Sequence, residues 1–163
     1  MFSFLINKHN VGCASIHTIC LFHTKHNHCF TFARFALDLV EVYFQIVHTR
    51  IPLLNPDQIR KRLNLQPGRQ NHHSSEKPVH PALVATVLAW GAKFSEHPLL
   101  VADRRRPGGQ SSLARTAIDR ARELAEAMKV HRVASTDHVV IGLLIEPLQN
   151  RMLLLVIISL PST

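Results

Sequence analysis

The chain has 163 residues, and 19 Lys or Arg against 11 Asp or Glu give it a formal net charge of +8 and a pI of about 10.1. This length allows one domain with a real core, and the charge suits nucleic acid or an anionic surface as a partner. The three cysteines, Cys13, Cys20 and Cys29, are an odd number without a convincing secretory signal, which argues against a disulfide framework. We therefore expect a soluble intracellular protein.

Acidic residues are confined to the middle of the chain, since none precedes Asp38 and none follows Glu146. A globular domain usually mixes both signs over its surface. We therefore divide the chain into an atypical His- and Cys-containing segment, 1–34, expected to be poorly ordered, a domain at 35–148 and an apolar tail at 149–163. The apolar run of the tail, Met152–Leu160, is roughly half the length of a bilayer span, so no membrane span is expected.

The first predicted helix has apolar residues at three- and four-residue steps, namely Phe35, Leu39, Val42, Tyr43 and Ile46. Pro52 ends it, because the residue before a proline is pushed out of the α region. Asn55-Pro56-Asp57 then supplies an N-cap, a proline at the first helical position and an acid in the first turn. The short helix that follows is expected to turn Ile59 and Leu63 inward, and Arg60, Lys61 and Arg62 to water.

The third predicted helix follows a polar stretch, Gln66–Pro78, which is expected to be a surface loop. It starts at Pro81 and runs to Phe94, with apolar side chains around most of its circumference. Such a helix is normally buried between others, so Trp90 and Phe94 are expected in the core. Gly91 lowers helix stability by about 1 kcal/mol relative to alanine, which is best explained by a close helix crossing.

The fourth predicted helix follows an exposed loop, 104–109, and begins after Ser111-Ser112. It carries one apolar stripe, formed by Ala114, Ala117, Ile118, Ala121, Leu124, Ala125 and Met128. Its other side is charged, with Arg115, Asp119, Arg122, Glu123, Glu126 and Lys129.

The last predicted helix is capped by Ser135-Thr136-Asp137, carries apolar residues and ends at Pro147. Its apolar residues are Val139, Val140, Leu143 and Leu144. No strand alternation is sustained anywhere in the sequence. The fold class is therefore all-α, a partial helical bundle of about five helices with irregular or disordered ends.

One group of side chains has zinc-ligand chemistry: Cys20, His23, His26, His28 and Cys29. Their spacing fits no common zinc finger, and no acidic residue nearby would orient the ligands. We expect only the adventitious metal binding of a His-rich tract, and we assign this chain no metal or cofactor site.

Two basic runs, Arg60-Lys61-Arg62 and Arg104-Arg105-Arg106, have the charge to contact phosphates or to act as import signals. A solvated helix face and a charged loop explain them more simply. No aromatic residues are interleaved with them, so bases would find no stacking platform.

No arrangement of residues favours catalysis, and we do not expect an enzyme. His72, His73 and His80 lie in or beside the predicted loop, and Ser74 and Ser75 lack the glycine-flanked turn of a serine nucleophile. The carboxylates of the fourth predicted helix share an exposed face with arginines, the usual setting of solvated charge; they are Asp119, Glu123 and Glu126.

Four segments are informative by their order along the chain. Val42-Tyr43-Phe44 is followed by the turn His48-Thr49-Arg50-Ile51-Pro52-Leu53-Leu54, then come the Ala/Leu-rich Leu88–Phe94, the Arg/Ala-rich Ala117–Leu124 and the Leu-rich Asp137–Leu148. In this order they resemble the regulatory domain of fungal zinc-cluster transcription factors, a helical domain. Thr49 stands where that family usually has a proline. The resemblance covers roughly residues 37–148.

The resemblance implies a part in transcriptional control in a fungal nucleus, through contacts with other proteins of the transcription machinery. In that family a separate N-terminal module of six cysteines holds two zinc ions and contacts DNA. The sequence has three cysteines and lacks the paired Cys-x2-Cys steps, so no DNA-contacting residue is carried over. The family domain is also longer than the matching stretch, and we expect a truncated product that is prone to self-association.

A different class of function remains open from the sequence. A small basic helical module could bind nucleic acid or anionic surfaces by charge alone, and its affinity would then fall steeply with salt. A third, weaker interpretation makes Met152–Leu160 a membrane-interacting tail, but its length argues against this.

Overall fold

The computed structural model describes residues 29–63, 79–105, 111–150 and 159, which contain six α-helices and no strand. The all-α prediction is therefore confirmed for this part of the chain. The helices are α2 (Cys29–Ile46), α3 (Pro56–Arg62), α4 (Pro81–Phe94), α5 (Pro98–Arg104), α6 (Ser112–Ala127) and α7 (Thr136–Gln149).

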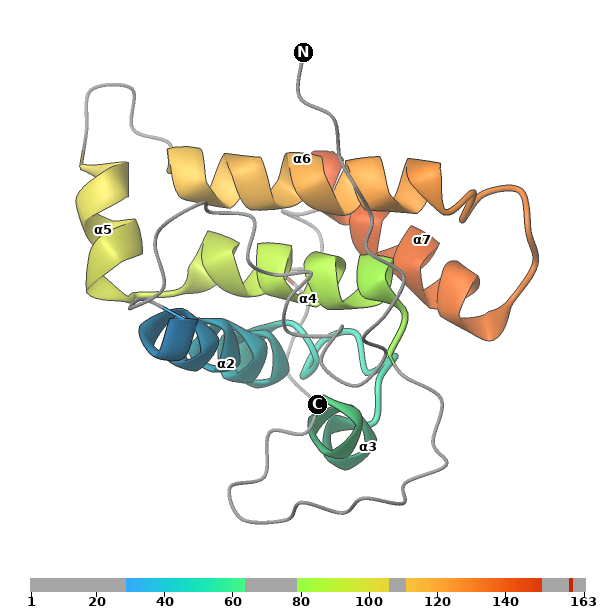
Figure 1. Ribbon diagram of the computed structural model, residues 1–163, viewed down its shortest axis with the longest axis horizontal. Coiled ribbons are helices and arrows are strands. Elements are labelled where there is room, and N and C mark those ends of the chain that lie inside the picture. Colours follow the sequence, from blue (N-terminus) through green and yellow to red (C-terminus); the bar gives the residue numbers. More distant parts are fainter. Residues whose placement is uncertain (1–28, 64–78, 106–110, 151–158, 160–163) are drawn as a thin grey trace.

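Helix α4 is the centre of the fold and packs against α2, α6 and α7 (Figure 1). It runs antiparallel to α6, while α2 lies on its opposite side and α5 stands at one end of the α4–α6 pair. Ten residues of α4 are buried, and they occupy every side of the helix. A helix this apolar can be accommodated only between others, as its sequence predicted.

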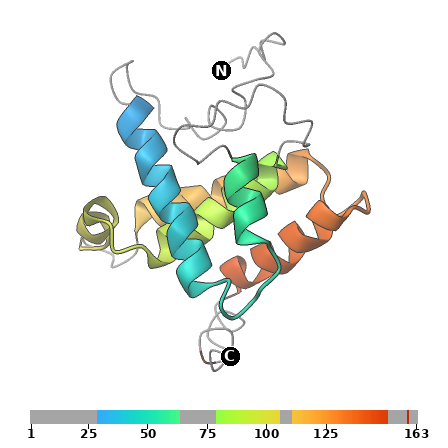
Figure 2. The same cartoon turned by 90° about the horizontal axis from the view of Figure 1, so that it is seen from below.

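Helix α2 crosses α4 (Figure 2). Gly91 of α4 lies against the backbone of Leu39 on α2. A Cβ atom at this position would be 2.1 Å from the Leu39 carbonyl oxygen and 2.9 Å from the Leu39 Cα. Side chains on both helices normally keep their backbones further apart, so only glycine permits this approach. The predicted close crossing is confirmed.

Two capping predictions hold, at Asn55 and Ser135, and Ser111 proves to be a third cap. The Asn55 side chain accepts a hydrogen bond from the Gln58 amide at 3.0 Å, with Pro56 at the first helical position of α3. Ser111 and Ser135 accept in the same way at the starts of α6 and α7. As predicted, Ile59 and Leu63 are buried.

The predicted helix boundaries were wrong at three places. Helix α2 begins at Cys29, so residues 29–34 of the segment expected to be poorly ordered are helical. Helix α5 was not predicted, because its seven residues show no period and its start was not recognised. It begins at Pro98, and the His97 ring caps it by accepting a hydrogen bond from the Leu99 amide. Helix α7 passes through Pro147 and ends at Gln149.

Pro147 is tolerated because it occupies the last turn of α7, where few helical hydrogen bonds remain to be made. A proline there removes one helical hydrogen bond, to the Leu143 carbonyl, and crowds that carbonyl. The buried Trp90 indole donates to the Leu144 carbonyl at 2.9 Å, and the Lys93 ammonium approaches the Leu148 carbonyl at 3.5 Å. Helix α4 thus holds the final turn of α7 by two polar contacts.

Tyr43 is fully buried in the core, and its hydroxyl has no hydrogen-bond partner among the described residues. Burial raises the pKa of Tyr43 above its ordinary value, because the charged form would lose its hydration. A buried hydroxyl without a partner costs stability, whereas a phenyl ring fills nearly the same volume at no such cost.

We therefore expect Tyr43→Phe to raise the free energy of unfolding by about 1 kcal/mol, measured by urea denaturation. The matched change Phe44→Leu, which removes volume from the neighbouring buried ring, should lower it by about 1 kcal/mol or more. A loss of stability in Tyr43→Phe as large as in Phe44→Leu would contradict the assignment of an unsatisfied hydroxyl.

Candidate functional site

The predicted zinc-ligand group lies almost entirely outside the described residues. Cys20, His23, His26 and His28 precede the first of them, and Cys29 is the first residue of α2. Within residues 29–63, 79–105 and 111–150, no three or more His, Cys, Asp or Glu side chains are grouped so as to hold a metal ion.

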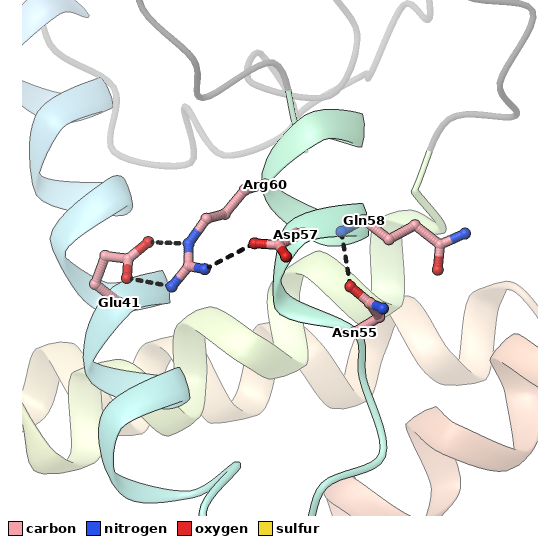
Figure 3. A network of polar contacts seen from close by, with 5 residues as sticks. All are labelled: Glu41, Asn55, Asp57, Gln58 and Arg60. Atoms are coloured by element: carbon pink, nitrogen blue, oxygen red, sulfur yellow. Dashed lines mark hydrogen bonds and ion pairs between the residues drawn. The ribbon is translucent and has the colours of Figure 1, made fainter.

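The first basic run is tied into the fold at Arg60 (Figure 3). Its guanidinium makes two hydrogen bonds of 2.7 Å to the Glu41 carboxylate, one from Nε to Oε1 and one from Nη2 to Oε2. It also lies 5.0 Å from the centroid of the Phe44 ring and 3.7 Å from Asp57. The prediction that Arg60 points to water was wrong, because the sequence does not reveal that Glu41 on α2 faces it.

This ion pair makes a pH-dependent contribution to stability. The hydrogen bonds from Arg60 lower the pKa of Glu41 below its ordinary value, although partial burial opposes this. A carboxylate whose pKa is lower in the folded state stabilises the fold above its unfolded-state pKa. That contribution is lost as pH falls through the folded-state pKa.

We expect Glu41→Gln to lower the free energy of unfolding by about 0.5–1 kcal/mol at pH 7, since the pair is partly exposed. The difference from wild type should shrink as the pH falls below about 4.5 and vanish once the pH is below the folded-state pKa of Glu41. Urea denaturation across this pH range measures it, with Glu126→Gln, which changes an exposed carboxylate of α6, as control. A difference that stays constant with pH would show that the ion pair is not its cause.

The second basic run was predicted to lie in an exposed loop. This is only partly correct. Arg104 lies in the last turn of α5, where its guanidinium contacts the Glu96 carboxylate at 3.3 Å and donates to the Ser95 carbonyl. Arg105 caps the helix and is exposed, whereas Arg106 lies outside the described residues. The first arginine of this run is thus paired with Ser95 and Glu96, which lie just before α5.

The acidic residues considered for catalysis remain on the surface. Asp119, Glu123 and Glu126 are exposed on the outer side of α6, and Glu123 pairs with Arg120 at 2.9 Å. This confirms the interpretation as solvated charge. Of the loop residues considered, His72, His73, Ser74 and Ser75 lie outside the described residues.

Trp90 and Phe94 belong to the core, as predicted. The Trp90 side chain is fully buried, and its ring stacks on that of Phe94 with centroids 5.9 Å apart. The Trp90 ring is fully buried and Phe94 is partly buried against the core, so this pair serves the packing between helices.

An apolar cavity of about 10 Å³ lies between α2, α3 and α4. It has room for about one water molecule, but its lining offers no polar partner that would hold one. The lining residues are Val40, Ile59, Leu63, Val79, Leu83, Val84 and Val87. The cavity is a packing defect and not a substrate site.

A buried carboxylate that was not predicted from the sequence joins α5 to α6. Asp103 is 3% exposed and accepts hydrogen bonds from the Ser111 hydroxyl at 2.7 Å, the Ser112 hydroxyl at 3.0 Å and the Leu113 amide at 2.9 Å. Its charge lies at the positive end of α6, where a carboxylate is favourable. The pair of serines before the predicted helix was the available signal, since each hydroxyl can donate to an acid.

The outer face of α7 has an uncovered apolar part, formed by Val139, Gly142 and Leu143, with the exposed Glu146 one turn further on. Val139 is 59% and Leu143 is 54% exposed, and nothing lies within 4 Å of a Cβ built on Gly142. Val133, before the helix, is 53% exposed. The opposite face is fully engaged, because Ile141, Leu144, Ile145 and Leu148 are buried. Within the described residues, this is where large apolar side chains reach the solvent on one helix at adjacent turns.

Comparisons of the chain with protein-family models, with curated proteins and with solved structures find no match. Among the helices that the structure describes, none combines the length and the apolar character that a membrane crossing requires.

Proposed function

We propose that this chain is a helical regulatory module of transcription, the partial regulatory domain of a fungal zinc-cluster transcription factor, which acts in the nucleus through contacts with other proteins. The observation that carries a protein-contact role is the outer face of α7. Apolar side chains exposed at Val139 and Leu143 are typical of a surface that another protein covers.

The shape of this face favours a helix as its occupant. Val139 and Leu143 are one turn apart and form a ridge, and Gly142 beside them leaves the helix backbone accessible. Ridges of this kind pack into the grooves of a partner helix. We propose that the partner is a helix of another protein of the transcription machinery.

The assignment to transcription is supported by the order of four sequence segments. Each segment lies in, or directly after, a different helix of the α4-centred fold. They are Val42–Leu54 at the end of α2 and beyond it, Leu88–Phe94 in α4, Ala117–Leu124 in α6 and Asp137–Leu148 in α7. Since the comparisons find no match, this order is the support for the family.

Binding of nucleic acid by charge alone is less well supported. Arg60 and Arg104, one from each basic run, are committed to Glu41 and Glu96. Acidic partners inside the protein reduce the field that these arginines present to phosphates. The chain should therefore bind duplex DNA weakly at physiological salt.

A tethered reporter tests the proposal. The full chain, fused to a heterologous DNA-binding module in a fungal host, should change transcription of a reporter that carries the matching site by several-fold over the module alone. The unfused chain should show no specific DNA affinity at physiological salt. An unchanged reporter, together with tight DNA binding that weakens steeply as salt rises, would establish the charge-driven alternative instead.

A further inference from the structure

Two histidines that are 58 residues apart in sequence meet at the starts of α4 and α7. His80 is the N-cap of α4 and His138 lies in the first turn of α7, and their Nε2 atoms are 3.3 Å apart. Both backbones are fixed by helix starts: the His80 carbonyl accepts from the Leu83 and Val84 amides, and the His138 amide donates to Ser135 Oγ. The imidazoles are therefore presented by rigid elements.

The tautomer of His138 is set by its second ring nitrogen. His138 Nδ1 lies 2.6 Å from the Val133 carbonyl oxygen, which can only accept, so Nδ1 carries the proton. In the neutral imidazole, the lone pair is then on Nε2, which faces His80. Metal-binding histidines are typically held in this way, with the other ring nitrogen donating to a backbone carbonyl or a carboxylate.

The spacing of the two nitrogens fits a shared tetrahedral ion. Two imidazole nitrogens, each about 2.05 Å from a tetrahedral zinc ion, are about 3.3 Å apart, whereas a square-planar ion would bring them to about 2.9 Å. The observed 3.3 Å matches the first value and is long for a hydrogen bond.

The orientation of the rings agrees with this distance. The ring centroids are 5.0 Å apart and the ring planes are inclined by 82°. Rings that both point at one zinc ion would have centroids about 5.2 Å apart, whereas rings aligned end to end across this gap would have about 5.6 Å. The two imidazoles therefore meet at an angle, as two ligands of one ion do.

We propose that His80 and His138 form a two-histidine zinc site that links the start of α4 to the start of α7. The ion binds both Nε2 atoms, and the proton of His80 resides on its Nδ1. Since no group of three such ligands occurs in the described residues, water or a ligand from a partner completes the coordination. Neither histidine belongs to the Cys- and His-containing group considered in the sequence.

Zinc binding at this site should stabilise the fold, because the two ligands come together only when α4 and α7 are packed. With zinc chloride at about ten times its dissociation constant, the unfolding temperature of the full chain should rise by roughly 4 °C. His80→Gln and His138→Gln should each abolish this rise, and the double variant should show no further loss. His131→Gln, an exposed histidine of the loop before α7, should retain it.

Each rise is measured against the same variant without zinc, so a change in basal stability does not obscure it. All variants keep the other histidines of the chain. Any zinc binding by those histidines therefore contributes equally to every variant. In parallel, the ¹⁵N signals of both Nε2 atoms should shift together on zinc addition. An equal rise in all variants, or no shift of these two signals, would assign the binding to other histidines and overturn the proposal.

Discussion

Gly91→Ala should lower the free energy of unfolding by at least about 3 kcal/mol. The added Cβ would lie 2.1 Å from the Leu39 carbonyl oxygen, well inside contact distance, and its nearest neighbours are backbone atoms that cannot rotate away. Relief requires α2 and α4 to separate, which opens the core around Tyr43 and Trp90. The gain in helix propensity, about 1 kcal/mol, is too small to offset this.

The matched control is Gly142→Ala, the same change in another helix. Nothing lies within 4 Å of a Cβ at Gly142, so only the propensity gain remains. We expect the control to raise the free energy of unfolding by about 0.5–1 kcal/mol. Urea denaturation should therefore show changes of opposite sign in the free energy of unfolding of the two variants. Equal effects would show that the crossing of α2 and α4 is wider than the structure has it.

Asp103→Ala is expected to have the next largest effect on stability. It should lower the free energy of unfolding by about 3 kcal/mol. The change leaves the Ser111 and Ser112 hydroxyls and the Leu113 amide without their acceptor, and Ser111 is itself buried. It also removes the negative charge from the start of α6, where the helix dipole favours it.

The control for Asp103 is Asp119→Ala, which removes an exposed acid from the middle of α6 and should change stability by less than about 0.5 kcal/mol. The loss of stability in Asp103→Asn should fall between those of Asp103→Ala and Asp119→Ala. An amide oxygen still accepts hydrogen bonds, but it lacks the negative charge. Thermal and urea denaturation measure all three. If Asp103→Ala were as mild as Asp119→Ala, the proposed link between α5 and α6 would be wrong.

Local signals predicted much of this fold correctly. The Asn55-Pro56-Asp57 cap, the serine cap at Ser135 and the start of α4 at Pro81 depend on neighbouring residues, so the sequence contains them. The crossing at Gly91 was also predictable, because a glycine inside an otherwise apolar helix needs a packing reason.

Features that depend on distant residues could not be predicted in the same way. Glu41 and Arg60 are on different helices, and His80 and His138 are on helices that meet only in the folded chain. Helix α7 is apolar around most of its circumference, so its pattern does not distinguish the buried Ile141 from the exposed Leu143. Its outer face, on which the proposed function depends, was visible only in three dimensions.

The tethered reporter with an altered α7 face tests the central claim most directly. Val139→Ser combined with Leu143→Ser removes the exposed apolar ridge without touching the buried side of the helix. The control, Arg122→Ser combined with Glu123→Ser, changes exposed residues of α6. With circular dichroism confirming that both fold, we predict that the first variant loses the reporter response and that the control keeps it. A full response from the first variant would contradict the account.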